Sequence, residues 1–185
     1  MRIIAGELRG RSLFYPQDRA FRPTQDRPKE ALFSILHPRL EGAKVADLFC
    51  GTGSLGLEAL SRGAESCVFV DIETTFLRKN IALFESMKPK AEVVSKPVQL
   101  WIKQKQGPFD IVMIDPPWHK EDRGKHHYDT ALLGLDEFDI LADSGILVCE
   151  HHKSLVLEET EHFEVTQTRA YSDTRLTFFQ KKVTL

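Results

Sequence analysis

From Lys44 onward the chain alternates short apolar runs with amphipathic stretches of helical period, and no other feature narrows the fold as far. Where a helix separates two consecutive strands, it carries the chain back to the end of the sheet at which the first strand began, so the two strands run parallel. Such sheets are covered by helices on both faces. The pattern therefore predicts an α/β domain with a mostly parallel sheet. The expected strands are 44–49, 66–71, 91–95, 109–115 and 145–150, and the expected helices are about 54–62, 74–86, 97–105 and 128–141.

The end of the chain has a different pattern. Residues 162–171 and 173–182 are rich in strand formers, and Ser172 and Asp173 supply a turn between them. Two strands joined by so short a turn pair as a hairpin. We expect this hairpin to add an antiparallel edge and to bring the sheet to seven strands.

The segment before Lys44 is expected to form a hairpin and a helix. Residues 2–6 and 11–15 flank Gly10, which suits a tight turn. Residues 24–36 fit a helix, with Thr24 as the N-cap and Pro28 in the first turn.

Charge separates this first part of the chain from the rest. The chain as a whole carries a net charge of −2, but residues 1–44 hold nine Lys or Arg against five acids, which is +4 and leaves −6 for the remainder. A basic segment on an acidic domain favours a polyanionic partner at one end of the molecule. We therefore divide the chain into a basic extension that would meet such a partner, residues 1–43, and a second domain, residues 44–185.

Several classes of protein are excluded by composition. No apolar run approaches the roughly 20 residues of a membrane span, and the first residues lack the pattern of a signal peptide, so a cytoplasmic protein is expected. The three cysteines are far apart and form no CxxC pair, which indicates reduced thiols. The histidine pairs 126–127 and 151–152 are adjacent in sequence and make poor joint ligands, so no metal is expected. Nothing in the sequence requires more than a monomer.

A glycine-rich loop follows the first expected strand in "DLFCGTGSLGLEAL". Gly51, Gly53 and Gly56 have the G-x-G-x-x-G spacing, which permits a tight turn, close approach of the backbone to a ligand and tight packing of the helix on the strand. Both dinucleotide enzymes and S-adenosylmethionine enzymes use such a loop.

Asp47 and the length of chain before the first strand favour S-adenosylmethionine over a nicotinamide dinucleotide, whereas Asp71 suits either cofactor. Asp71 ends the second strand, twenty residues after Gly51, where a carboxylate accepts the ribose hydroxyls of either cofactor. Asp47 precedes the loop by four residues, where it would attract a cationic amino-acid moiety and repel a pyrophosphate. A dinucleotide-binding domain also usually begins close to its first strand, whereas here 43 residues precede that strand.

The sequence "DPPW", residues 115–118, ends the fourth strand. In an open parallel sheet the ligand binds beyond the carboxyl ends of the strands, so this motif and the glycine loop share one crevice. The prolines hold a rigid bend that leaves carbonyl oxygens as fixed acceptors. A carboxylate, a proline carbonyl and an aromatic plate match an exocyclic amino group on a flat ring, and Trp118 would stack on a base flipped out of its helix.

With these motifs the chain resembles the RsmD family, 16S ribosomal RNA guanine-N2 methyltransferases. The resemblance rests on "MRIIAGELRGRSL", "RPTQDRPKEALFSIL", "DLFCGTGSLGLEALSRGA", "FDIVMIDPPW" and "GILVCEH". It implies a Rossmann-like class I methyltransferase fold and methyl transfer from S-adenosylmethionine to N2 of one guanine, of the guanine-966 type, in 16S ribosomal RNA or the assembling small subunit. Ser172 stands where the family tends to have glycine, and "SKPVQ" lacks the Asp that often reads the adenine amino group, so adenine recognition stays open.

The predicted site residues fall into three groups. The catalytic group is Asp115, Pro116, Pro117 and Trp118. The cofactor group is Asp47, Phe49, Cys50, Gly51, Thr52, Gly53, Gly56, Asp71 and Ile72. The RNA-binding group is Arg2, Arg9, Arg11, Arg22, Thr24, Arg27 and Lys29.

Two other functions remain open on the residues alone. The four-residue motif also suits an amino-methyltransferase acting on adenine in DNA or RNA, or on a protein glutamine. A catalytically silent RNA-binding factor of ribosome assembly would keep the same fold.

Overall fold

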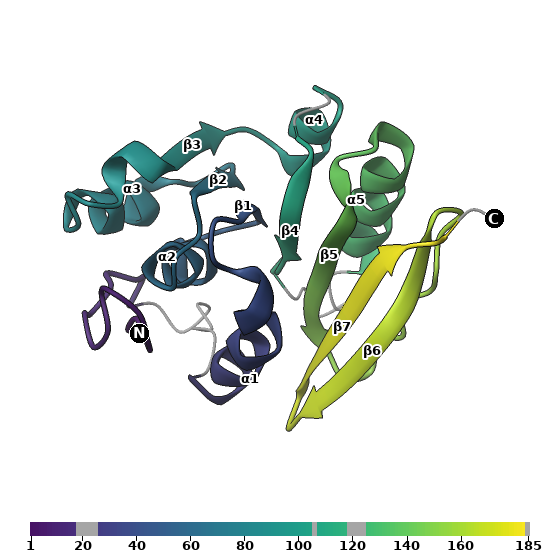
Figure 1. Cartoon of the computed structure of the whole chain (residues 1–185), viewed down its shortest axis with the longest axis horizontal. Helices are drawn as coiled ribbons and strands as arrows, with labels where there is room; N and C mark the ends of the chain where they lie inside the picture. Colours follow the sequence, from purple (N-terminus) through teal and green to yellow (C-terminus); the bar gives the residue numbers. More distant parts are fainter. Residues whose placement is uncertain (18–25, 105–106, 118–124, 184–185) are drawn as a thin grey trace.

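A seven-stranded sheet forms the centre of the molecule in the computed structural model, which describes residues 1–17, 26–104, 107–117 and 125–183. The strand order is β3-β2-β1-β4-β5-β7-β6 (Figure 1). The first five strands pair in parallel, and β7 pairs antiparallel with both β5 and β6. The sequence prediction of a mostly parallel sheet with an antiparallel edge is confirmed.

The elements lie close to their expected positions. The strands are β1 Lys44–Leu48, β2 Ser66–Asp71, β3 Ala91–Ser95, β4 Phe109–Ile114, β5 Leu141–His152, β6 Phe163–Tyr171 and β7 Thr174–Lys181. The α-helices are α1 Asp26–Leu36, α2 Ser54–Ser61, α3 Thr75–Ala82, α4 Val98–Ile102 and α5 Lys125–Phe138. Short 3₁₀ turns lie at His37–Arg39 and Lys88–Lys90. None of the described helices is long and apolar enough to cross a lipid bilayer.

Two differences from the expected boundaries have local causes. β5 starts four residues earlier than predicted, at Leu141, and its pairing with β4 is irregular between Phe109 and Ile111. A ladder irregularity of this kind absorbs the polar residues Asp143 and Ser144, which do not read as strand. Helix α3 also ends four residues earlier than expected, at Ala82, because the backbone then tightens: Leu83 N and Phe84 N donate to the carbonyls three residues before them.

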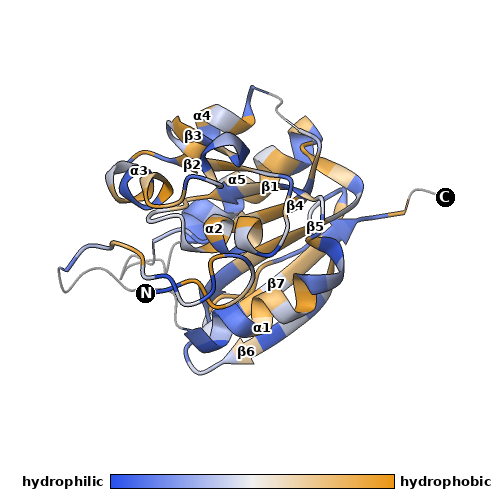
Figure 2. Ribbon diagram, turned by 60° about the vertical axis from the view of Figure 1, so that its left-hand side comes forward, coloured by the Kyte–Doolittle hydropathy of each residue, from blue (hydrophilic) through white to orange (hydrophobic). Residues whose placement is uncertain are grey.

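The sheet separates two apolar layers. α1, α2, α3 and the first residues of the chain pack on one face, whereas α4 and α5 pack on the other. Figure 2 shows the apolar central strands between these two helical layers. Successive strand residues alternate between the two layers, as Val45 and Ala46 do in β1. Nearly every residue of the central strands is buried, which explains why these strands read as continuous apolar runs.

The amino-terminal segment, defined here as residues 1–17, crosses the face that carries α2 and α3. Its two arms pair through backbone hydrogen bonds from Ile3 N to Arg11 O and from Leu13 N to Met1 O, and only the pair Arg2 and Ser12 forms a β-bridge. The predicted hairpin is thus reduced to a single bridge. Ile3 and Leu13 are buried in the core with residues of the sheet, so tertiary packing holds the segment instead of a ladder.

Candidate active site

The carboxyl ends of β1 and β4 lie side by side where the strand order reverses. β1 has β2 on one side and β4 on the other, and the chain leaves β1 and β4 in opposite directions along the sheet. Ligands of open α/β sheets bind at such a reversal. The glycine loop follows β1 and "DPP" follows β4, so the fold brings the two predicted motifs to one edge.

The glycine loop needs backbone conformations that side chains disfavour. Gly51 and Gly53 have φ of 52° and 77°. A Cβ on Gly53 would lie 2.4 Å from Leu77 Cδ1, and one on Gly56 would lie 2.3 Å from the Phe69 ring, whereas one on Gly51 would meet nothing within 4 Å. Gly53 and Gly56 therefore allow the loop and α2 to pack on the sheet. Gly51 is different, because it faces open space where a ligand has room.

Asp71 holds the loop from the end of β2. Its Oδ2 accepts a hydrogen bond from Gly51 N at 2.9 Å, and its Oδ1 accepts one from Glu73 N at 3.0 Å. The next residue, Ile72, is 73% exposed. A partly exposed carboxylate beside an exposed apolar side chain and an open glycine fits the ribose and the base of a nucleoside cofactor. Gly51, Asp71 and Ile72 of the predicted cofactor group are thus suited to such a cofactor, and adenine recognition remains unassigned.

Asp47 is buried beneath the loop, with 1% of its surface exposed. Its Oδ2 accepts a hydrogen bond from Gly56 N at 2.8 Å, in the first turn of α2. Burial raises the pKa of Asp47 to about 7; the Gly56 hydrogen bond opposes this shift, and the charges of Asp115 and Asp71 add to it. The sequence predicted the position of this carboxylate beside the loop but not its burial.

Asp115 extends β4 by one residue, and its backbone N donates to Leu48 O at 3.3 Å. Its side chain is partly exposed at the edge of the sheet, whereas Pro116 is buried and Pro117 is exposed. A partly exposed acid on a rigid strand end suits an acceptor for a substrate donor. Trp118 lies outside the described residues.

Phe49 and His127 form a contact that the sequence did not predict. Phe49 has a φ of 60°, which is rare for a residue with a side chain, and its ring lies 5.4 Å from the His127 ring. Strained backbone of this kind concentrates at functional sites. The contact brings the first turn of α5 to the glycine loop, and because it joins residues 78 positions apart, no local pattern signals it.

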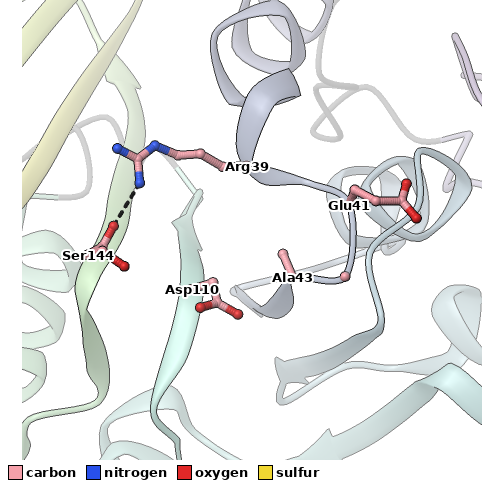
Figure 3. A pocket seen from close by; sticks show the side chains of 6 residues that line it. Arg39, Glu41, Ala43, Asp110 and Ser144 are labelled. Atoms are coloured by element: carbon pink, nitrogen blue, oxygen red, sulfur yellow. Dashed lines mark hydrogen bonds between the residues drawn. The ribbon is translucent and has the colours of Figure 1, made fainter.

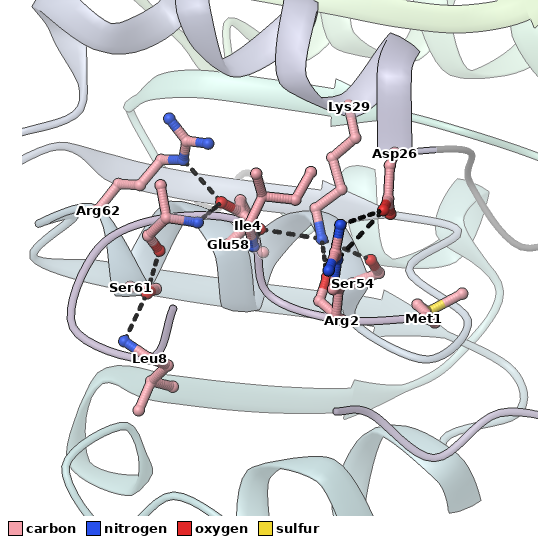
Figure 4. A network of polar contacts seen from close by, with 12 residues as sticks. Met1, Arg2, Ile4, Leu8, Asp26, Lys29, Ser54, Glu58, Ser61 and Arg62 are labelled. Carbon is pink, nitrogen blue, oxygen red and sulfur yellow. Dashed lines mark hydrogen bonds and ion pairs between the residues drawn. The ribbon is translucent and has the colours of Figure 1, made fainter. Parts of the chain in front are cut away.

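Lys29 does not contact solvent and is removed from the predicted RNA-binding set. It is 1% exposed, and its Nζ pairs with Glu58 Oε2 at 3.0 Å (Figure 4). The same Nζ donates to Arg2 O and to Ser54 Oγ, each at 3.0 Å. Burial lowers the pKa of Lys29, and the charge of Glu58 opposes that effect. Lys29 was predicted to bind RNA because it belongs to the basic segment, and its buried partner 29 residues away leaves no local signal in the sequence.

Glu58 of α2 and Asn80 of α3 fasten the amino-terminal segment to the rest of the fold. Glu58 accepts hydrogen bonds from Ile4 N at 2.8 Å and Ala5 N at 2.9 Å. Asn80 exchanges two hydrogen bonds with the backbone of Phe14, and its Nδ2 also donates to Thr52 O at 2.9 Å. One buried amide therefore connects the segment directly to the glycine loop.

The exposed cations of the predicted RNA-binding set lie around this segment. Arg2, Arg9, Arg11 and Arg27 have exposed side chains. Arg2 pairs with Asp26 at 3.1 Å in a solvent-exposed contact, and Arg11 lies over the Phe84 ring. Arg22 and Thr24 lie outside the described residues.

A surface hollow of about 270 Å³ lies at the amino ends of the parallel strands, opposite the predicted motifs (Figure 3). Arg39 bridges it by donating to Ser144 O at 2.7 Å, and Asp110 accepts from Lys44 N at 2.8 Å. Because Lys44 and Asp110 lie at the amino ends of β1 and β4, this hollow is separated by the length of the strands from the predicted motifs.

Comparisons with known proteins show to which family the chain belongs. The family model described as "Conserved hypothetical protein 95" matches residues 1–180. A Bacillus subtilis protein named "Putative rRNA methyltransferase YlbH" is 36% identical over 98% of this chain and all of its own length. The Haemophilus influenzae protein "Ribosomal RNA small subunit methyltransferase D" is 41% identical over 64% of each chain.

The fold agrees with a solved structure as well. The Escherichia coli structure named "Putative methyltransferase yhhF" superposes with a TM-score of 0.84, at 29% identity and over 98% of each chain. The sheet order, the glycine loop after β1 and the acid after β4 are those of a Rossmann-like class I methyltransferase. On its sequence match and on its fold, the chain belongs to the RsmD family, the family of "Conserved hypothetical protein 95".

Proposed function

We propose that the protein transfers a methyl group from S-adenosylmethionine to the exocyclic N2 amino group of one guanine in the 16S ribosomal RNA of the small subunit. The observation that carries the proposal is the partly exposed carboxylate of Asp115, at the end of β4 and next to the glycine loop of β1. The names of the family's relatives support ribosomal RNA as the substrate class.

The residues around the glycine loop are the proposed cofactor site. S-Adenosylmethionine supplies a methyl group that is electrophilic because it is bonded to a cationic sulfur. Asp71 and Ile72 would bind the nucleoside half, and Gly51 would let the backbone come close to the ligand. Asp47 lies beneath the loop, so its negative charge would favour the cationic amino-acid half through the loop.

Asp115 and Pro116 are proposed to prepare the acceptor. The lone pair of an exocyclic amine is delocalised into the ring, which makes the amine a poor nucleophile. If the Asp115 carboxylate and the Pro116 carbonyl each accept one N–H, the lone pair is held toward the methyl group and the developing positive charge is stabilised. Holding both reactants in this arrangement supplies part of the roughly 7 to 11 kcal/mol that proximity offers. Trp118 is proposed to stack on the flipped base, for about 1 to 3 kcal/mol.

The exposed arginines are proposed to contact RNA phosphates. Arg9 and Arg11 project from the amino-terminal segment, which is fastened to the glycine loop through Asn80, so phosphate contacts would orient the RNA relative to the cofactor. Such contacts set the position of the RNA and carry no information about the base. Arg2, Arg22, Thr24 and Arg27 complete the proposed surface.

A methylation assay with labelled cofactor tests the proposal. Purified protein is incubated with naked 16S ribosomal RNA, with small subunits from cells that lack the protein, and with DNA, and the labelled nucleoside is identified by mass spectrometry. We expect N2-methylguanosine in one of the two ribosomal substrates. Label in adenine or in DNA alone would establish the alternative amino-methyltransferase, and no label in any substrate would favour the assembly factor.

Asp115→Asn separates chemistry from binding in this assay. The amide cannot accept through both side-chain atoms and carries no charge, so we expect kcat to fall by roughly 100-fold or more. The affinity for S-adenosylmethionine, measured by calorimetry, should change little. An equal loss in cofactor affinity would contradict the role assigned to Asp115.

A further inference from the structure

Glu150 is a buried carboxylate that has no role in the reaction proposed above. It lies near the carboxyl end of β5 and is 7% exposed. Its Oε2 is buried and accepts no hydrogen bond from any residue that the structure describes. A buried acceptor left without a donor costs about 1 to 3 kcal/mol, so it calls for a physical explanation.

The strand register places Glu150 beside Asp115. β4 and β5 are parallel, with Ile114 opposite Cys149, so the next pair along the strands is Asp115 and Glu150. Residues opposite each other on neighbouring strands are about 5 Å apart. The two carboxylates are therefore adjacent at the carboxyl edge of the sheet.

Both side chains point to the face that carries α1 and α2. Met113 and Val148 belong to the apolar layer on that face, and Asp115 and Glu150 follow each of them by two residues. On β7 the residue opposite Glu150 is Leu176, which belongs to the same layer. Strand residues two apart share a face, so the two carboxylates face the same side of the cleft as Asp47.

Lys29, whose charge acts on Glu150, does not donate a hydrogen bond to it. Burial raises the pKa of Glu150 to about 7, and the charge of Lys29 opposes that shift. The ammonium group of Lys29 has three N–H donors. These go to Arg2 O, Ser54 Oγ and Glu58 Oε2, each at 3.0 Å. Lys29 thus influences Glu150 through its field and has no donor left to give it.

A guanine offers the donor that Glu150 lacks. Its Watson–Crick edge carries the N1–H beside the N2 amino group, whereas adenine has a bare acceptor at N1. With the amino group at Asp115 and Pro116, the adjacent N1–H falls toward the neighbouring carboxylate. We propose that Glu150 accepts the N1–H of the target base and thereby selects guanine over adenine, an inference that rests on the proposed function.

The test uses a purine that differs from guanine at this edge. 2,6-Diaminopurine keeps the N2 amino group but has an unprotonated N1. It is placed at the target position by ligation of 16S ribosomal RNA, and kcat/KM is compared with that for guanine, on whichever of free RNA and reconstituted subunit the protein methylates. We expect the wild-type protein to prefer guanine by roughly 10-fold to 100-fold, because its carboxylate faces a lone pair in the analogue.

Glu150→Gln should change this preference. The variant has the same shape, and its amide can donate to the bare N1 of diaminopurine. We expect the guanine preference to fall by roughly 10-fold or more, with unchanged cofactor affinity. Glu92→Gln, which alters an exposed carboxylate on β3, is the control and should leave the ratio as it is.

The outcomes are distinct for the two proposals. Equal rates of the wild-type protein on the two purines, or an unchanged preference in Glu150→Gln, would overturn the role of Glu150 while guanine methylation itself stands. Label in adenine in place of guanine would overturn both the role and the proposed function. A lower preference together with a normal melting temperature would show that Glu150 acts on the base and not only on the fold.

Discussion

At the scale of single residues, the burial and the pKa of some side chains depend on packing between distant segments and cannot be predicted from neighbouring residues. The sequence predicted Asp47, Asp71 and Asp115 at the ligand edge, because the loop and strand patterns mark these positions. It did not show that Asp47 is sealed beneath the loop, since burial depends on packing between distant segments. The burial of Asp47 has a measurable effect on the stability of the protein.

Asp47 makes the stability of the cofactor-free protein depend on pH. Its pKa is about 7 in the folded protein, whereas an Asp side chain that is not buried has a pKa of 3.8, so between about pH 4 and 7 the folded protein holds a proton that the unfolded chain has lost. Its contribution to stability therefore falls as the pH rises through this window and stays low above it. We expect Asp47→Asn to match the wild-type protein near pH 4 and to exceed it by up to roughly 4 kcal/mol near pH 8.

Urea unfolding at several pH values measures this difference. The Asn side chain keeps an oxygen for Gly56 N, so the hydrogen bond at the loop is preserved. S-Adenosylmethionine should bind the variant more weakly, because the cation loses its counter-charge. A stability difference that does not vary with pH would show that Asp47 is ionised in the folded protein throughout.

Ser172 is a strained position in the β6–β7 turn. Tyr171 pairs with Thr174, which leaves Ser172 and Asp173 as a two-residue loop, and only Ser172 of the two has a positive φ, 54°. This pattern suits a type II′ turn, in which glycine is preferred first. We expect Ser172→Gly to raise the free energy of unfolding by about 1 kcal/mol, measured by urea titration. Asp173→Gly is the matched control and should not stabilise the protein.

At the scale of elements, the sequence predicted helices and strands well because apolar periodicity is a local signal. Helix α1 is the exception in one respect. Its end at Leu36 follows the pattern, but Lys29 lies inward, in a pair with Glu58 that joins α1 to α2. The prediction of an amino-terminal hairpin was wrong for a similar reason. The two arms are held by Glu58, Ser61 and Asn80 from other elements, and the sequence gives no local signal for these contacts.

Breaking the Lys29–Glu58 pair should destabilise the protein strongly. Lys29→Met leaves Glu58 buried with fewer donors, and removal of one member of a buried pair costs about 3 to 5 kcal/mol. Lys125→Met is the matched control, because Lys125 pairs with Asp129 on the surface of α5 and such pairs contribute about 1 kcal/mol or less. Urea unfolding compares the two variants. Similar losses in both would mean that burial adds nothing to the Lys29 pair.

At the scale of the whole molecule, the basic residues of the first part of the chain have a defined place on the fold. The sequence predicted a basic end from the count of charges in the first 44 residues. The structure places the exposed Arg9 and Arg11 on the segment that lies against α2 and α3, close to the last turn of α2, where Glu7 N and Leu8 N bond to Ser61. Composition could not supply this placement, because it depends on hydrogen bonds between residues more than fifty positions apart.

The salt dependence of RNA binding reports on this surface. If Arg9 and Arg11 each neutralise one phosphate, the double variant Arg9→Ala, Arg11→Ala should lower the slope of log K against log salt by about 1.5. The double variant Lys103→Ala, Lys182→Ala removes two exposed cations at the opposite edge and should leave the slope unchanged. Filter binding at several salt concentrations measures both. A slope that changes equally in the two variants would indicate diffuse attraction without defined contacts.

The anchoring of residues 1–14 also bears on how the partner is met. Flexible basic arms gain order when they reach a nucleic acid, and that ordering appears as a large negative heat-capacity change. Here Glu58, Ser61 and Asn80 already hold the backbone of this stretch without any RNA. Its conformational entropy is therefore lost during folding of the protein, and the calorimetric signature of its encounter with RNA should be that of two preformed surfaces meeting.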